Sequence, residues 1–190
     1  MLLSEQIAHR DLVNGSVTEL HKHSYRSALQ TAILVASSST ETQLLGLSLP
    51  ANCLNDRTII RFWAVGKIST GSTPPTTTWN IRIGPSSLTG RVLATAAPTV
   101  LNSLVDRMWL IESVVTVVYS GPYGTLVSNG MIFGEYSTLV NQAVKGMPMV
   151  SSNPVDTTVA NTIELTFKFG TASSSNRLSS VNATIECIDP

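Results

Sequence analysis

The sequence predicts an all-β domain of antiparallel strands, arranged as a sandwich, a jelly roll or a small barrel. From Thr31 onward, apolar and polar residues alternate in one short segment after another, and connectors rich in Gly, Pro, Ser and Thr separate these segments. The composition agrees, because 24 Ser and 22 Thr supply most of the polar side chains while only 13% of the residues are charged. At roughly 100–200 residues per domain, a chain of 190 residues is one domain with a short appendage.

The first 30 residues differ from the rest and predict an N-terminal arm. Apolar residues near helical spacing occur at Leu3, Ile7, Leu12 and Val13, and Gly15 follows them as a stop signal. A helix this short is marginal by itself, so its apolar face needs a partner. We therefore divide the chain into a partly helical anchoring arm over residues 1–30 and a β domain over residues 31–190.

Eight or nine strands are expected in the β domain. In chain order they span residues 32–36, 43–49, 60–65, 79–83, 91–94, 105–119, 125–133, 161–169 and 181–187. The connection GTASSSN between the last two is rich in turn residues, so we expect these two strands to pair as an antiparallel hairpin. No strand is expected between residues 141 and 158, where breakers are frequent.

The expected strand over residues 105–119 is apolar on both faces. One face consists of Trp109, Ile111, Val115 and Val117, and the other of Leu110, Val114 and Val118. Such a strand needs cover on both faces. In a sandwich only one face meets the core, so the other is covered by a loop or arm of the same chain or by another subunit. We expect Leu110, Val114 and Val118 to lie at a homo-oligomer interface, because few charges are available to solvate the outside of the sheets.

The sequence contains no catalytic motif. It has no G-x-S-x-G, P-loop, H-E-x-x-H or C-x-x-C pattern, and all three histidines precede residue 24. The acidic residues of the β domain are scattered singly. We therefore expect a protein that is not an enzyme. Cys53 and Cys187 are expected to be reduced, with a disulfide between them left open.

Charge and hydropathy exclude two further classes of partner. The chain has 12 Lys+Arg and 12 Asp+Glu, so there is no excess of basic residues for nucleic acid or an anionic membrane. No segment approaches the roughly 18 apolar residues of a membrane-spanning helix, and the first eleven residues lack the apolar core of a signal peptide. We expect no nucleic-acid partner and no membrane insertion.

The tripeptide His21-Lys22-His23 is a candidate metal site. In an extended segment, residues i and i+2 project to the same side. If three chains meet at a threefold axis, His21 and His23 of each chain supply six imidazoles, an octahedral set that suits a first-row transition metal. The alternative is that these are surface histidines in a polar linker and that the protein has no cofactor.

From residue 25 to residue 188, the order of features resembles a domain found in structural proteins of tailed bacteriophages. The matching segments are SALQTAILVASSSTETQLLGLSLPAN, RTIIRFWAVGKIST, TWNIRIG, MWLIESVVTVVYSG and VDTTVANTIELTFKFGTASSSNRLSSVNATIECI. The stretch VTELHKHSY is also similar to the H-x-H linkers of phage fibres. Proteins of this kind are trimeric jelly rolls on the outside of phage particles. The resemblance implies a jelly-roll-like antiparallel β-sandwich, a homotrimer and no catalytic residues.

This resemblance predicts a capsid cement, or decoration, protein. Such a protein would be assembled in the host cytoplasm and sit on the virion surface, where the arm residues Leu3, Ile7, Leu12 and Val13 contact the major capsid protein and the trimer stabilises the capsid. An arm of thirty residues is too short to build the shaft of a fibre, which favours this role.

The alternative is the receptor-binding head of a tail fibre or spike, or a collar or baseplate appendage. Its partners would be a host cell-surface receptor and tail proteins. In that case Trp79 and Tyr123 are candidate aromatic platforms for a sugar, although the alternation around Trp79 favours burial of this residue in the core.

Overall fold

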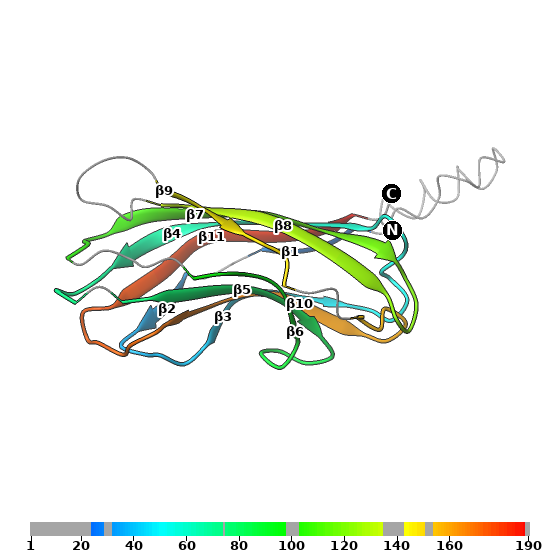
Figure 1. The fold of residues 1–190 in the computed structure, drawn as a ribbon, viewed down its shortest axis with the longest axis horizontal. Helices are drawn as coiled ribbons and strands as arrows, with labels where there is room; N and C mark the ends of the chain where they lie inside the picture. The colour runs from blue at the N-terminus through cyan, green and yellow to red at the C-terminus, as the bar shows by residue number, and fades with distance from the viewer. Residues whose placement is uncertain are drawn as a thin grey trace, which may run out of the picture.

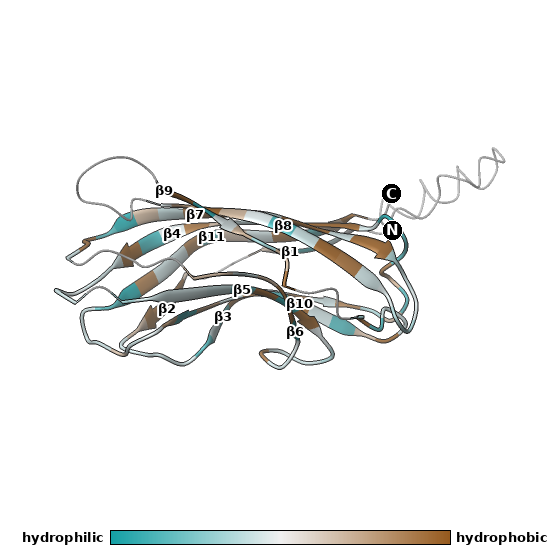
Figure 2. Ribbon diagram, in the orientation of Figure 1, coloured by the Kyte–Doolittle hydropathy of each residue, from teal (hydrophilic) through white to brown (hydrophobic). Residues whose placement is uncertain are grey.

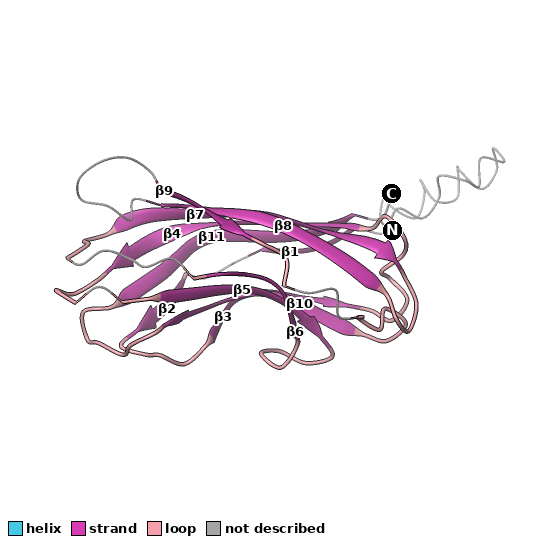
Figure 3. Ribbon diagram, in the orientation of Figure 1, coloured by secondary structure: helices cyan, strands magenta, loops and turns pink. Residues whose placement is uncertain are grey.

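The protein is an antiparallel β-sandwich. The computed structural model describes residues 24–28, 32–73, 75–97, 103–134, 143–150 and 154–188. This part of the chain contains eleven strands and no helix (Figure 3). The strands form two antiparallel sheets that face each other (Figure 1), which confirms the predicted all-β class. The helix expected between Leu3 and Val13 lies outside the described residues.

The strands follow the predicted segments closely, and their bounds are β1 (Ser24–Ala28), β2 (Ile33–Ala36), β3 (Thr42–Leu49), β4 (Ile59–Ser69), β5 (Thr77–Gly84), β6 (Arg91–Ala96), β7 (Arg107–Tyr119), β8 (Thr125–Gly134), β9 (Ala143–Met147), β10 (Asn161–Phe169) and β11 (Arg177–Ile188). One sheet has the order β1-β11-β4-β7-β8-β9, with β2 also pairing with β11, and the other has the order β3-β10-β5-β6. The chain passes from one sheet to the other between β2 and β3, β3 and β4, β4 and β5, β6 and β7, β9 and β10, and β10 and β11. This order is consistent with a jelly roll that β8 and β9 extend at one edge.

The predicted hairpin of the last two strands is wrong. β10 pairs with β3 and β5 in the four-stranded sheet, whereas β11 pairs with β1, β2 and β4 in the other sheet. Residues 170–176 therefore cross the sandwich instead of forming a turn within one sheet. The physical reason is burial. Each strand has an apolar face, and these faces are buried against each other when the strands belong to opposite sheets.

Two short strands lie in segments for which no strand was expected. β9 lies within the connector between residues 141 and 158, where Met147 is buried in the core and pairs with Gly130 of β8. β1 lies within the segment assigned to the arm and pairs with β11 along its whole length, from Ser24 to Ala28. The sheet thus includes part of the segment that was divided from the β domain at residue 30.

The core is centred on four aromatic rings contributed by both sheets. Trp79 lies 4.9 Å from Trp109 and 4.5 Å from Phe167, and Phe167 lies 4.8 Å from Phe169, measured between ring centroids. All four side chains are fully buried. Trp79 is therefore a core residue, as its alternation predicted, and it presents no surface for a sugar.

Candidate functional site

The outer face of the seven-stranded sheet carries many partly or fully exposed apolar side chains, and we call this set the outer apolar face. It consists of Trp63, Val65, Met108, Leu110, Val114, Val118, Val127, Met131, Phe133 and Val144. Figure 2 shows hydrophobic stretches along β7 and β8, two of the strands that contribute to it. Four of these residues lie in one row across four strands, since Leu110 is in register with Val65 and Phe133, and Phe133 with Val144. Directly opposite side chains of this kind contact one another.

The structure places Leu110, Val114 and Val118 together on the outer apolar face. The alternate residues of β7, including Trp109, Ile111, Val115 and Val117, are buried in the core. Val114 is 42% exposed and Val118 is 39% exposed in the single chain, while Leu110 is partly covered by its neighbours. β7 is thus apolar on both faces, and only one of them is covered by the described residues. Burial of the other against a partner remains a prediction.

Charges of both signs lie on this side of the sheet. Arg61 and Lys67 of β4 stand beside Glu112 of β7 and Glu186 of β11, and Arg26 of β1 and Arg61 are both in register with Glu186. None of these five side chains forms an ion pair within the described part of the chain. Charges of both signs are therefore free to pair with those of another molecule.

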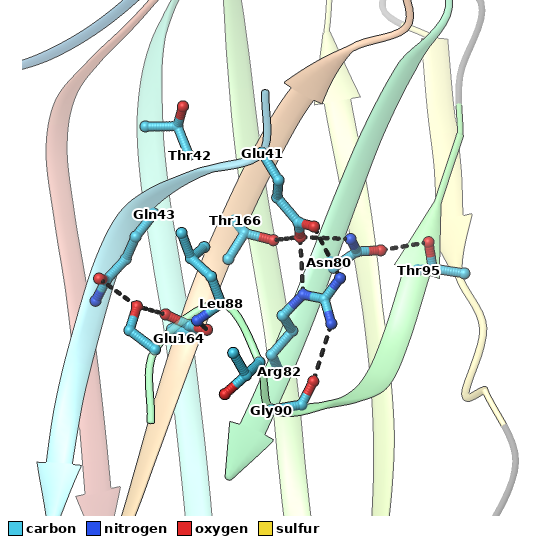
Figure 4. Close-up of polar contacts among 12 residues, drawn as sticks. Glu41, Thr42, Gln43, Asn80, Arg82, Leu88, Gly90, Thr95, Glu164 and Thr166 are labelled. Carbon is cyan, nitrogen blue, oxygen red and sulfur yellow. Dashed lines mark hydrogen bonds and ion pairs between the residues drawn. The ribbon is translucent and has the colours of Figure 1, made fainter. Parts of the chain in front are cut away.

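A second site, a cluster of polar side chains, lies on the outer face of the four-stranded sheet (Figure 4). Arg82 of β5 donates through Nε and Nη2 to the two carboxylate oxygens of Glu41, both at 2.8 Å. Asn80 Nδ2 donates to Glu41 Oε1 at 2.8 Å, and the Thr166 hydroxyl donates to the same oxygen. Burial raises the pKa of the Glu41 carboxyl, but the hydrogen bonds from Arg82, Thr166 and Asn80 outweigh it and lower this pKa to about 2.

Glu164 is the second carboxylate of this polar cluster. It points away from the core on β10, yet it is buried because the loop after β5 folds over it. The hydroxyl of Ser87 and the backbone N–H of Leu88 donate to its two oxygens at 2.7 and 2.6 Å. Gln43 Oε1 lies 2.9 Å from the same Ser87 hydroxyl, as a second acceptor for its single hydrogen. Glu164 thus attaches this loop to the sheet.

The polar cluster stabilises the sheet and offers no free catalytic group. Both carboxylates accept hydrogen bonds on each oxygen from other parts of the chain, so neither is available to take a proton from a ligand. Within the described ranges, no group of three or more His, Cys, Asp or Glu side chains is placed to hold a metal ion. Sequence analysis missed this cluster, because Glu41, Arg82 and Thr166 meet only through the order of β3, β10 and β5.

Several predicted site residues lie outside the described part of the chain. They are the arm residues Leu3, Ile7, Leu12 and Val13 and the metal-site candidates His21 and His23. No disulfide joins Cys53, which is partly buried, to Cys187, which is buried in the core. Among the described residues, no helix is long and apolar enough to cross a membrane.

Comparison with known proteins yields similarity to solved structures only. No family model matches the chain, and no curated protein matches it. A carbohydrate-binding module of the evolved Dit protein of Lactobacillus casei phage J-1 is 10% identical, with a TM-score of 0.38, covering 89% of this chain and 98% of that one. Winged bean acidic lectin is 6% identical, with a TM-score of 0.39, covering 88% and 100%. An alginate lyase from Alteromonas is 8% identical, with a TM-score of 0.33, covering 87% and 95%. Likeness at this level does not indicate what the chain binds.

Proposed function

We propose that this protein is a non-enzymatic structural protein of a bacteriophage particle, a homotrimer that binds the outside of the capsid and stabilises it. The observation that carries the proposal is the outer apolar face. Exposed apolar side chains gathered on one face of a sheet are typical of a site of association with another molecule. The resemblance of the sequence to phage structural proteins supports the place on the particle and the number of three chains.

A second copy of the chain is the partner that best fits the outer apolar face. In a symmetric assembly the same surface elements recur on every subunit, so each charge needs an opposite charge on an identical neighbour. The outer face carries charges of both signs, Arg61 and Lys67 beside Glu112 and Glu186, which can meet this need. A different molecule recognised by its charge would instead favour a surface on which all charges have the same sign.

Contact with the major capsid protein is assigned to residues 1–23, which precede the first strand. Their apolar residues at helical spacing suit an amphipathic segment that folds on a partner surface. Because β1 starts at Ser24, each arm leaves the sandwich at the edge of the seven-stranded sheet, where β1 pairs with β11. The carboxylates of the polar cluster accept hydrogen bonds on every oxygen from the chain itself, which supports a structural role for this cluster.

The alternative function is the receptor-binding head of a tail fibre or spike, or a collar or baseplate appendage. A specific observation favours it, because Tyr123 is 82% exposed at the turn between β7 and β8 and is available to contact a receptor. In this arrangement the arms would run parallel to one another, and His21 and His23 would converge on the threefold axis with a transition metal.

Imaging of the intact particle separates the two functions. Density for the protein at every capsomer is the expected result, whereas density confined to the tail would replace the capsid role by the alternative. The second test mixes a protein lacking residues 1–23 with particles that lack the protein. We expect this shortened protein to fold and to fail to bind, and undiminished binding would refute the assignment of the capsid contact to the arm.

A further inference from the structure

A cleft of about 380 Å³ lies where three loops meet at one end of the sandwich. The connection between β5 and β6 forms one wall, the turn between β7 and β8 the second, and the segment before β10 the third. Its lining includes Thr89, Arg91, Pro122, Tyr123, Pro154 and Asp156. The volume falls at the lower end of the roughly 300–1,000 Å³ found for small-ligand pockets.

The turn that carries Tyr123 is held rigidly by backbone hydrogen bonds. Gly121 donates its N–H to Thr157 Oγ1 at 2.8 Å and accepts from the N–H of Thr157 at 3.0 Å, while Val155 N–H donates to the carbonyl of Gly124 at 2.8 Å. Gly121 has a φ of 117°, a conformation that favours glycine. The aromatic ring is thus presented to solvent on a fixed turn. The backbone of this turn therefore loses little conformational entropy when a ligand binds.

The other two walls are equally fixed. The base of the β5–β6 connection is closed tightly, since a Cβ added to Gly84 would lie 2.7 Å from Gly90 Cα, and Arg82 donates to the Gly90 carbonyl at 2.9 Å. This closure sets the position of the neighbouring Arg91. In the third wall, Asp156 Oδ1 accepts from the N–H and the hydroxyl of Thr158 at 2.9 and 2.5 Å.

Three side chains in this rigid cleft have hydrogen-bond donors or acceptors that no other described residue occupies. Within the described part of the chain, the Arg91 guanidinium and the Tyr123 hydroxyl have no hydrogen-bond partner, and Asp156 Oδ2 accepts no hydrogen bond. An aromatic ring, a fork of N–H donors and a carboxylate oxygen together match a ring with one apolar face and adjacent hydroxyl groups.

From this arrangement we propose that the cleft binds a neutral saccharide. The ring of Tyr123 stacks on the apolar face of a pyranose, Arg91 donates to its hydroxyl oxygens, and Asp156 Oδ2 accepts from a hydroxyl group. Arg91 and Asp156 are the two charged residues among those that line the cleft, so their charges cancel and select against an anionic sugar. The site does not depend on whether the protein sits on the capsid or on the tail.

A peptide strand fits this end of the sandwich less well. β6 is an edge strand of the four-stranded sheet, and the chain itself covers this edge. Val150 N–H donates to the Leu93 carbonyl at 2.9 Å, and Thr95 N–H donates to the Pro148 carbonyl at 3.3 Å. An extended peptide therefore finds no row of unpaired backbone groups along this strand.

The test is binding of the full-length protein to an array of immobilised neutral hexose and N-acetylhexosamine oligosaccharides. Uronic acid oligosaccharides and a proline-rich peptide are included on the same array. We expect binding to at least one neutral glycan, which titration calorimetry then quantifies. Binding to none of the neutral glycans, or stronger binding to the uronic acids or to the peptide, would overturn the proposal.

Variants locate the bound glycan. Tyr123→Ala is expected to weaken affinity about tenfold through loss of the stacked ring, whereas Tyr119→Ala, which removes an exposed tyrosine outside the cleft, leaves affinity unchanged. Asp156→Asn retains Oδ1 as the acceptor for Thr158 and replaces only the free oxygen, so it keeps the loop and weakens binding. If Tyr119→Ala and Tyr123→Ala lowered the affinity for the glycan equally, a binding site in this cleft would be refuted.

Discussion

Glu41, which directly precedes β3, connects three strands of one sheet through its contacts with Arg82 of β5 and Thr166 of β10. The loss of a charge-assisted hydrogen-bond set typically destabilises a protein by about 1.5–3 kcal/mol. We therefore expect Glu41→Gln to lower the free energy of unfolding by about 2 kcal/mol at neutral pH. Urea denaturation of the wild type and of Glu41→Gln measures this difference.

The effect of Glu41→Gln should also depend on pH. Because the pKa of Glu41 falls from 4.5 to about 2 on folding, the folded chain binds fewer protons than the unfolded chain between these values. The stabilisation is complete above the unfolded pKa and is lost as the pH falls toward the folded one. In urea titrations, the free energies of unfolding of the wild type and of Glu41→Gln should thus differ by a constant amount at neutral pH. They should converge as the pH approaches 2. A difference that stays constant throughout this range would contradict the assigned role of Glu41.

Two buried serines on neighbouring strands should respond oppositely to replacement by alanine. Ser113 Oγ donates to the Asn129 carbonyl at 2.8 Å, whereas Ser128 Oγ is buried without a hydrogen-bond partner among the described residues. Ser113→Ala is expected to destabilise the fold by about 1 kcal/mol, and Ser128→Ala to stabilise it by a similar amount. Thermal unfolding of the two variants measures both effects, and a loss of stability in Ser128→Ala would show that its hydroxyl has a partner in solution.

At the scale of single elements, alternation predicted which residues of a strand share a face but not which strands lie side by side. The inward residues of β10, Ile163, Leu165 and Phe167, are buried as expected. The same alternation did not place β10 and β11 in opposite sheets, because pairing is decided by the whole set of strands. Nor did it identify β9, because its five residues, AVKGM, do not alternate between apolar and polar, and the strand is recognised only by its pairing with β8.

The contact between β4 and β11 depends on a glycine. A Cβ at Gly66 would lie 1.8 Å from the Ser179 carbonyl oxygen and 2.7 Å from the ring of Trp109. This close approach adjoins the irregularity in β11 between Ser180 and Asn182. We expect Gly66→Ala to destabilise the protein by about 2 kcal/mol or more, since neither backbone nor buried ring can move freely.

Gly146 of β9 is the control for this substitution, because no atom lies within 4 Å of an added Cβ there. Gly146→Ala should leave stability unchanged or raise it by about 0.5 kcal/mol, since alanine loses less entropy than glycine on folding. Chemical denaturation of the two variants compares them directly. A Gly66→Ala protein as stable as Gly146→Ala would show that β4 and β11 are not packed as described.

At the scale of the whole molecule, the sequence predicted the fold class better than it predicted sites. The alternation of apolar and polar residues with a period of two is a local property of the sequence. It was enough to infer a sandwich and to recognise that the strand at β7 is apolar on both faces. The polar cluster and the cleft each combine residues from three distant segments, so neither could be recognised before the strand order was known. Tyr123 is the exception, because a tyrosine within the turn SGPYG is expected to be exposed.

Because β7 is apolar on both faces, we can make a prediction about the assembly. Val114 lies on the outer apolar face and is 42% exposed in the single chain, so a lysine at this position can extend into water in the monomer. In the proposed trimer the same ammonium group would be buried against an apolar neighbour, where an unpaired charge is strongly destabilising. Light scattering should therefore report three chains per particle for the wild type and one for Val114→Lys, with unchanged circular dichroism.

Val105→Lys is the matched control for this prediction, because Val105 is 75% exposed and precedes β7 outside the sheet. It makes the same chemical change away from the outer apolar face, so three chains per particle should remain. If Val114→Lys kept the mass of the wild type, the outer apolar face would not be the subunit interface. If the wild type itself had the mass of one chain, the outer apolar face and the charges around Arg61 and Glu112 would have to meet a different molecule.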